Sequence, residues 1–473
     1  MADAVSVPFV LFVVLCMLAG WALLEHFVLP ALRIVASSSA EKLIEEVSAR
    51  LKIGIRPFQR TERRVLIDRL LFDPRVQEAT AAFAKSADIS ARLAQSIVEK
   101  YAKETVPAFN AYLYFRIGYW IGRRVAQTLY RVRLGYVDSE GLAKMDPDAT
   151  VVFVMNHRSN MDYVLAGYLA ADQAALSYAV GEWARIWPLS HLIRSMGAYF
   201  VRRNSKDDLY RKVLERYIAM ATEAGVPQAV FPEGGLSRDG RMREPRLGVL
   251  DYMMRGFKTD GERDVVFIPL GINYDRVLED RTLLLSINPE AGKGGKARAA
   301  SGTVRFVFRN LALLVKSKWH KFGYACVNFG SPVSMRAYCA EHGIDFSKLP
   351  REERQVRMAE LGKHLMDAVG RVVPVLPVPL MATVFVRHSG RSLSMLEMKA
   401  EIEAILDDLD AANAHVYVPR RDLDYALDAG LRMLLLRHLV DEYDGLYSAR
   451  LEELQVLRYY ANSIAHLLPV NPA

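Results

Sequence analysis

The sequence predicts an α/β protein with a central, mostly parallel sheet flanked by helices, set between an N-terminal helical domain and a C-terminal helical region. Short apolar runs at 151–155, 228–231 and 265–272 have the length and composition of buried strands. Segments with helical apolar spacing, such as 207–225, separate these runs. Strands that alternate with helices favour a sheet covered on both faces, so we place the α/β domain at 136–350.

The chain begins with a long apolar segment. No charged residue occurs from Ala4 to Leu24, which is enough residues to cross a bilayer as one helix. A cleaved signal peptide is the competing interpretation, but it needs positive charge ahead of the apolar core, where only Asp3 is charged. Lysines and arginines follow the segment instead. We therefore predict a retained, single-pass transmembrane helix over 4–29, with the rest of the chain on the cytoplasmic side.

Helical periodicity dominates on both sides of the predicted sheet. Residues 36–135 show it throughout, and the basic, aromatic end of this domain (114–133) fits either a membrane surface or an ordinary core-facing helix. Residues 351–473 return to helix, with two amphipathic segments. Between them, the proline-rich apolar stretch 372–386 is interpreted as a connector.

The composition excludes several classes of function. The net charge of +8 suits nucleic acid, an anionic membrane or acidic small molecules, yet no basic block interleaved with aromatics is present. Residues 392–455 hint at a helix–turn–helix with a hairpin, but their many acids would repel phosphates, so no nucleic-acid partner is expected. The three cysteines form no CxxC pair, and no cluster has metal-ligand spacing. We expect neither a metal nor an organic cofactor.

The segment NHRSNMD (156–162) directly follows the 151–155 strand and carries the first candidate chemistry. A helix that starts near Ser159 would let the carboxylate of Asp162 reach back to the ring of His157. A carboxylate on one ring nitrogen fixes the tautomer and raises the basicity of the other nitrogen, which then serves as a general base. The alternative is a helix cap with an incidental histidine and aspartate.

Two arginine-bearing segments follow. GAYFVRRN (197–204) ends in Arg202 and Arg203, whose planar guanidinium groups suit phosphate oxygens. FPEGGLSRDGRMREPRLG (231–248) joins a glycine turn to a hydroxyl and several guanidinium groups, which together fit an anion. The alternative for both is a solvated basic loop. The residues of the second segment that we assign to this phosphate site are Gly234, Gly235, Ser237, Arg238 and Arg246.

A fourth segment, FIPLGINYDRV (267–277), is interpreted as a strand that lines an apolar channel through Ile268 and Pro269, with core packing as the equal alternative. The chain has no serine or cysteine nucleophile elbow. A base without a protein nucleophile, beside basic loops, predicts direct attack of a phosphorylated alcohol on an acyl thioester. Backbone N–H groups would stabilise the oxyanion, but the sequence does not indicate which.

In this order, the four segments resemble the successive blocks of the glycerolipid acyltransferases. The HRS-x-MDY and GG-x-SR-x-G forms are similar to the glycerol-3-phosphate 1-O-acyltransferase branch, which includes dihydroxyacetone-phosphate acyltransferases. Segments 324–335, 372–386 and 457–468 resemble later parts of that branch. The resemblance implies an acyltransferase that uses acyl-CoA or acyl carrier protein, glycerol 3-phosphate and membrane lipids, at a membrane of the bacterial inner-membrane type.

Carried over residue by residue, the resemblance makes His157 and Asp162 the catalytic pair. It gives the glycerol phosphate to Arg202, Arg203, Ser237 and Arg238, in a loop shaped by Glu233 and Gly234. Leu236 departs from the usual arginine, and Arg246 stands where lysine is frequent. Dihydroxyacetone phosphate and 1-acylglycerol 3-phosphate remain alternative acceptors. The alternative outside enzymology is a silent lipid-binding protein, which the intact His157/Asp162 pair argues against.

Overall fold

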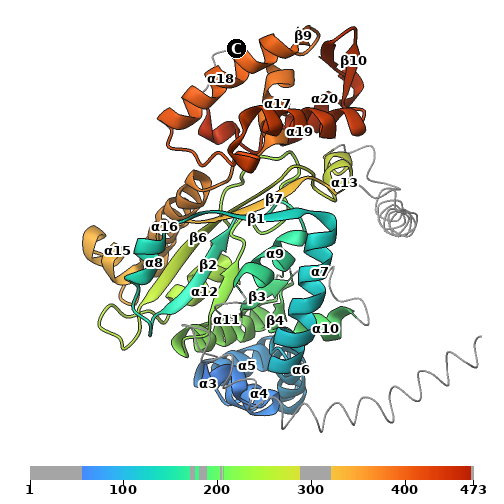
Figure 1. Ribbon diagram of the computed structural model, residues 1–473. Helices are drawn as coiled ribbons and strands as arrows, with labels where there is room; N and C mark the ends of the chain where they lie inside the picture. The colour runs from blue at the N-terminus through green and yellow to red at the C-terminus, as the bar shows by residue number, and fades with distance from the viewer. Residues whose placement is uncertain are drawn as a thin grey trace, which may run out of the picture.

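The structure is a computed structural model, and it describes residues 56–170, 176–180, 189–202, 205, 207–287 and 321–469. The predicted transmembrane helix at 4–29 and the start of the 36–135 helical domain lie outside the described residues. Among the helices that the structure does describe, none combines the length and apolar character needed to cross a membrane. Figure 1 shows N-terminal helices in blue, a central sheet with its flanking helices, and a C-terminal helical domain in orange and red.

The N-terminal part is helical, as predicted. It comprises α3 (Pro57–Arg60), α4 (Arg63–Leu71), α5 (Pro74–Ser86), α6 (Ala91–Thr105), the π-helical turn η2 (Leu113–Gly118) and α7 (Tyr119–Leu129). The caps have clear causes: Asp73 accepts the backbone N–H groups of Arg75 and Val76 at the start of α5, and Ser90 accepts that of Leu93 in α6.

The prediction that helix continues to residue 135 was wrong, because Arg131–Val137 forms strand β1. Its register pairs Arg131 with Tyr324 and Leu134 with Val327. β1 lies at the edge of the sheet, and five of its seven residues, all between Arg131 and Tyr136, are exposed. An exposed edge strand needs no apolar run, so the basic and aromatic residues here carried no strand signal.

The sheet has the order β1-β7-β6-β2-β5-β3-β4, with β8 paired to β6. The strands are β2 (Thr150–Met155), β3 (Ser177–Val180), β4 (Ala198–Phe200), β5 (Gln228–Val230), β6 (Val265–Tyr274), β7 (Tyr324–Phe329) and β8 (Val333–Ser334). The block from β6 to β4 is parallel, whereas β7 runs antiparallel to β6 and carries β1 with it. The three strands predicted at 151–155, 228–231 and 265–272 are confirmed as β2, β5 and β6.

Both faces of this sheet are buried, which explains its continuous apolar runs. Along β2, Phe153 and Met155 point into one core and Val152 and Val154 into the other, because strand side chains alternate. The first core also takes in α7, α9 (Met161–Ala170) and the C-terminal domain, whereas the second takes in the N-terminal helices and those of the opposite face. These opposite-face helices are α11 (Asp208–Glu223), α12 (Gly248–Met254), α15 (Met335–His342) and α16 (Arg351–Arg371).

Three short helices complete the central part: α8 (Ser139–Ala143), α10 (Leu189–Ser195) and α13 (Asp280–Leu285). α8 begins after Asp138, whose side chain accepts the N–H of Gly141. α13 follows the end of β6 in the chain and lies against α20. The turn between β6 and α13 matters for the site, because it brings charged side chains beside the β2–α9 loop.

The C-terminal domain surrounds α17 (Pro377–Arg387), and the interpretation of 372–386 as a connector was wrong. Pro377 and Pro379 occupy the first turn of α17, where a helix does not need their missing N–H groups. Residues 377–385 are all buried, against α19 and α20. The domain also contains β9 (Ser392–Ser394), α18 (Met395–Ala411), η5 (Pro419–Arg421), α19 (Leu423–Leu436), β10 (Val440–Tyr443), β11 (Leu446–Ala449), η6 (Leu451–Glu453), α20 (Leu454–Ala461) and η7 (Ala465–Leu467).

Close approach of backbone to backbone joins the sheet to the end of α16. A Cβ atom on Gly271 of β6 would lie 2.1 Å from the carbonyl oxygen of Val372. We expect Gly271→Ala to lower the free energy of unfolding by about 1–3 kcal/mol, because the overpacked backbone must move. The shift in the thermal unfolding midpoint measures this effect.

Gly167→Ala is the matched control, because nothing lies within 4 Å of a Cβ there and the position is helical. Alanine is the better helix former, so the control should keep or slightly raise the midpoint. Equal midpoints for the two variants would contradict the close approach at Gly271.

Candidate active site

The loop between β2 and α9 holds the predicted base, and the neighbouring strand fixes its start. The side chain of Asn156 donates to the carbonyl of Ile272 and accepts the N–H of Ile272, both at 2.8 Å. This amide imitates a peptide unit and extends the β2–β6 ladder by one residue. The backbone N–H of His157 then donates to Glu233 at 2.9 Å, and its carbonyl accepts the N–H of Ser237 at 2.9 Å.

The structure brings His157 and Asp162 together, with Nδ1 of the ring 2.9 Å from Oδ2 of the carboxylate. The same oxygen accepts the backbone N–H groups of Arg158 at 2.7 Å and Ser159 at 3.0 Å. The other oxygen accepts the hydroxyl of Tyr274 at 2.5 Å. The Asp162 side chain is fully buried, and these four polar groups surround its two oxygens. A carboxylate at Nδ1 places the proton there and leaves Nε2 as the acceptor.

Nε2 of His157 makes no hydrogen bond to any residue that the structure describes. The ring stacks on Phe231 with centroids 4.1 Å apart and meets Tyr163 edge-on at 5.4 Å. These aromatic contacts and the Asp162 bond fix the ring plane. The exposed fraction of the His157 side chain is only 2%, yet the ring lines a cavity. A base that is ordered, nearly dry and still accessible suits proton abstraction from a bound alcohol.

Tyr274 and Glu279 are site residues that we did not predict from the sequence. Burial and the charge of Asp162 raise the pKa of Tyr274 well above its usual value, so this hydroxyl stays a proton donor. Glu279 accepts the Ser159 hydroxyl at 2.8 Å and the backbone and side-chain N–H groups of Asn160 at 3.2 and 3.0 Å. Burial raises the pKa of Glu279 as well. No local motif marks either residue, because their partners lie more than 110 positions away.

Glu233 joins the catalytic loop to the third segment. Besides the His157 N–H, its carboxylate accepts the backbone N–H of Arg243 at 3.2 Å. Burial raises the pKa of Glu233 to about 7, and the charge of Arg158 together with the two N–H donors acts against that rise. Glu233 therefore shapes the loop, as the resemblance implied, and does not itself line the cavity.

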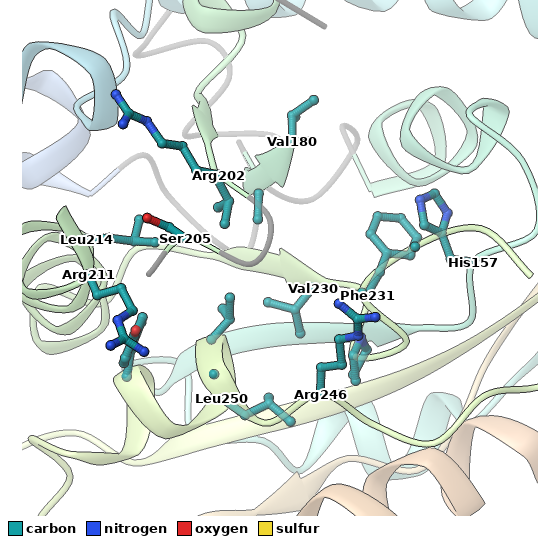
Figure 2. Close-up of a pocket in the computed structure, with 18 of the residues that line it drawn as sticks. His157, Val180, Arg202, Ser205, Arg211, Leu214, Val230, Phe231, Arg246 and Leu250 are labelled. Carbon is teal, nitrogen blue, oxygen red and sulfur yellow. The ribbon is translucent and has the colours of Figure 1, made fainter. Parts of the chain in front are cut away.

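The cavity beside His157 has a volume of about 350 Å³, and Figure 2 shows His157 at one end of it and Arg211 at the other. Its wall between them is largely apolar, with Val180, Leu214 and Leu250 among the lining residues. Three arginines, Arg202, Arg211 and Arg246, line the same space. The arrangement offers a base, an apolar wall and positive charge to one ligand.

Arg202 does line the cavity, but its guanidinium is already engaged. Glu104 of α6 accepts its Nε at 2.9 Å and its Nη2 at 2.6 Å, a two-pronged pair. Tyr101 and Tyr210 flank the group, with ring centroids 5.1 and 4.8 Å away. Hydrogen bonding to Glu104 holds the pKa of Arg202 above its usual value. The N-terminal helical domain thus contributes to the wall of the site, and Arg203 lies outside the described residues.

The glycine-rich segment is divided between the cavity and its support. Gly234, Gly235 and Arg246 line the cavity. Gly234 has φ +67°, and a Cβ there would lie 2.5 Å from Cδ of Arg246, so only glycine lets this arginine lie against the turn.

Ser237 and Arg238 do not line the cavity. The Ser237 hydroxyl is buried and donates to the carbonyl of Arg241 at 2.7 Å, which closes the turn, whereas the side chain of Arg238 is exposed. The structure therefore assigns Ser237 a role in the loop, and it keeps Arg238 apart from His157.

Ile268 and Pro269 do not line the cavity either, and the channel interpretation was wrong for both. They lie in the middle of β6, where Ile268 is opposite Phe153 and Pro269 opposite Val154. Both are buried, and Ile268 belongs to the core that contains the C-terminal domain. A strand with neighbours on both sides and helices on both faces has no open surface. The alternative, core packing, holds.

Comparisons with known proteins agree with the resemblance. Residues 136–273 match the acyltransferase family model, and residues 309–473 match the model of the glycerol-3-phosphate acyltransferase C-terminal region. A glycerol-3-phosphate acyltransferase of Aeromonas hydrophila subsp. hydrophila is 27% identical over 416 residues, which are 86% of this chain and 50% of that protein. One from Pseudomonas savastanoi pv. phaseolicola is 26% identical over 424 residues, 86% of this chain and 49% of that protein.

The chain thus spans about half the length of the curated relatives it matches. A solved structure, the 1-acyl-sn-glycerophosphate acyltransferase PlsC from Thermotoga maritima, is 20% identical and covers 54% of this chain and 76% of its own. The TM-score is 0.31, which is too low for residue positions to be transferred. The family-model matches support an acyltransferase fold for the mostly parallel sheet and its helices.

The raised pKa of Glu233 predicts a dependence of stability on pH. An acid whose pKa is about 7 when folded, against 4.5 ordinarily, keeps its proton in the fold while the unfolded chain loses it. Stability is therefore full below pH 4.5 and falls as the pH rises through 7, by roughly 3 kcal/mol. We expect Glu233→Gln to lose no stability for this reason. Relative to the parent, its free energy of unfolding should therefore be higher at pH 8 than at pH 5.

Thermal or urea unfolding at those two pH values measures the effect. Glu244→Gln is the matched control, because Glu244 is exposed in the same loop. If Glu233→Gln followed the parent at both pH values, as the control should, the carboxyl of Glu233 would not titrate in this range.

Proposed function

We propose that this chain, a member of the glycerol-3-phosphate acyltransferase branch of the glycerolipid acyltransferase superfamily, transfers a fatty acyl group to the sn-1 hydroxyl of glycerol 3-phosphate. The donor is an acyl thioester, of coenzyme A or of acyl carrier protein, and the product is lysophosphatidate for phospholipid synthesis. One observation carries the proposal: the His157 ring, bound to a buried carboxylate, lines a cavity that guanidinium groups also reach. Relatives named glycerol-3-phosphate acyltransferase support it along 86% of the chain.

In the proposed reaction, Nε2 of His157 takes the proton from the acceptor hydroxyl while the oxygen attacks the thioester carbonyl. The tetrahedral intermediate collapses, the C–S bond breaks, and the imidazolium returns the proton to the departing thiolate. Asp162 stabilises the imidazolium through Nδ1 and keeps the ring in place. Because the acceptor oxygen attacks directly, the protein needs no nucleophile of its own and no metal or organic cofactor enters the proposal.

Arg246 and Arg202 are the groups we propose for the acceptor phosphate, because both reach the cavity that contains His157. Arg202 would bind through Nη1, since Glu104 occupies Nε and Nη2. Arg203, Ser237 and Arg238, which the resemblance assigns to the same task, enter this proposal only through the loops that they belong to. Dihydroxyacetone phosphate and 1-acylglycerol 3-phosphate carry the same phosphate and are the alternative acceptors.

We further propose that the protein is anchored by a single transmembrane helix at 4–29, with the catalytic domain on the cytoplasmic side of a bacterial inner membrane. The apolar run without charge from Ala4 to Leu24, followed by lysine and arginine, supports this topology. Membrane lipids would then be immediate neighbours of the product, which is itself a lipid. Nucleic acid has no part in the proposal.

His157→Ala should lower transfer from palmitoyl-CoA to glycerol 3-phosphate by about 10²–10⁴-fold, because the general base is lost. An assay of product formation with both donors and the three acceptors measures the effect and identifies the preferred pair. His364→Ala, at an exposed position of α16, is the control and should retain full activity.

Two results would count against this assignment. Full turnover by His157→Ala, in protein with the parent's unfolding midpoint, would remove His157 as the base. Parent protein inactive with every donor and acceptor would favour the silent lipid-binding alternative.

Tyr274→Phe should lower kcat about tenfold with little change in the KM for the acceptor, because Tyr274 touches Asp162 and lies outside the cavity lining. With one donor fewer, the carboxylate holds the ring proton more tightly. The acidic limb of the pH–rate profile should therefore move to higher pH. Tyr443→Phe, which changes an exposed tyrosine, is the control. A drop in kcat with an unmoved pH profile would indicate a structural role only.

A further inference from the structure

A second cavity lies between α11, α12 and the start of α16, on the side of the molecule where Arg211 ends the first one. Its volume is about 320 Å³. The lining combines five cations and two carboxylates with one aromatic ring: Asp208, Arg211, Lys212, Glu215, Tyr252, Arg255, Arg351 and Arg354. So many guanidinium and ammonium groups around one small space form a site for a compact polyanion.

The carboxylates nearby do not neutralise these cations, because most are shared. Glu215 accepts both Lys212 at 3.0 Å and Arg255 at 2.5 Å. Asp251, behind the cavity, accepts Arg255 at 2.6 Å and lies 3.3 Å from Nε of Arg354. Two carboxylates therefore serve three cations.

The other two cations of the cavity are Arg211, which has a carboxylate partner, and Arg351, which has none among the described residues. Arg211 pairs with Asp208, whereas Arg351 has no ion pair with any residue that the structure describes. Nε of Arg354 is buried and lacks a hydrogen bond of good geometry within that same part of the chain. Five cations thus face three carboxylates, and two arginines keep donors for a ligand.

This cationic cavity adjoins the candidate active site, because Arg211 and Tyr252 line both. Figure 2 shows Arg211 across the active-site cavity from His157, with Leu214 beside Arg211 and Val230 between the two ends. A ligand with a reactive group at His157 and a long arm along this wall would place its far end among the arginines. Such a ligand would have its reactive carbonyl at one end and negative charge at the other.

We propose that the cationic cavity binds the phosphate groups of coenzyme A when a coenzyme A thioester is the acyl donor. The inference rests on the proposed function. Coenzyme A carries its thiol on a flexible arm and its phosphates on the nucleotide at the other end, as the two cavities require. A small cavity lined by arginines suits phosphate groups, whereas a carrier protein would need a broad exposed face.

The test compares two palmitoyl thioesters, of which only palmitoyl-CoA carries the nucleotide with its phosphates and the full-length arm. Arg351→Ala should raise the KM for palmitoyl-CoA about three- to tenfold, and leave that for the palmitoyl thioester of N-acetylcysteamine unchanged. Added salt should raise the palmitoyl-CoA KM of the parent and affect the neutral thioester less. Lys363→Ala, an exposed cation on the same helix, is the control and should behave as the parent.

A binding measurement keeps the test independent of turnover. Calorimetry with adenosine 3′,5′-bisphosphate and the full chain in detergent should show binding to the parent and to Lys363→Ala, and weakened binding to Arg351→Ala. Equal KM values for palmitoyl-CoA in parent and variant would overturn the proposal, as would equal increases for both thioesters. An increase confined to the thioester of acyl carrier protein would reassign the cavity to a carrier-protein contact.

Failure of the wider proposal is distinguishable from failure of this one. If the parent transferred acyl groups from none of the three thioesters, the proposed function would be wrong. Bisphosphate binding that depended on Arg351 would then still support a nucleotide site. Normal transfer with no effect of Arg351→Ala on either KM or binding would reject the cationic cavity alone.

Discussion

The site depends on the buried carboxylate of Asp162 and the four donors around it. Two are backbone N–H groups of the catalytic loop, one is the His157 ring, and one is the Tyr274 hydroxyl. A buried carboxyl group is costly unless its oxygens are hydrogen-bonded, so the loop and the end of β6 must come together around Asp162. The same pairing aims the imidazole. Folding of the loop and preparation of the base are thus one physical event.

The C-terminal domain supports this loop from the side opposite the cavity. The guanidinium of Arg158, next to the base, is buried and donates to the carbonyl of Ser463 at 3.0 Å. Ser463 also accepts the side chain of Asn273 from β6 at 3.2 Å, and a Cβ on Gly240 would meet the carbonyl of Tyr459. Contacts of this kind tie the end of β6 and the third segment to α20 and to the turn that follows it. Residues far along the chain therefore help to hold the catalytic loop in register.

Sequence patterns predicted the parts of the fold in which local chemistry and burial agree. The apolar runs of β2, β5 and β6 were recognisable because both faces of those strands are covered. β1 was not predicted as a strand because an edge strand can have exposed polar side chains and so lacks an apolar run. α17 was mistaken for a connector because prolines usually end helices, and only its position at the first turn makes them harmless. Ile268 looked like a channel residue because apolar lining and apolar core have the same composition.

By itself, the sequence determined the α/β class, the pairing of His157 with Asp162, and the basic character of the loops around them. These features depend on residues within a few positions of one another, where helix and strand geometry are fixed. Only the tertiary structure decided which arginines line the cavity beside His157. Glu104 accepts two of the N–H groups of Arg202, and Arg238 does not line the cavity. Side chains far apart in the sequence can pair with the same arginine, as Glu104 does with Arg202. The order of residues along the chain does not show which of them lies nearest in the fold.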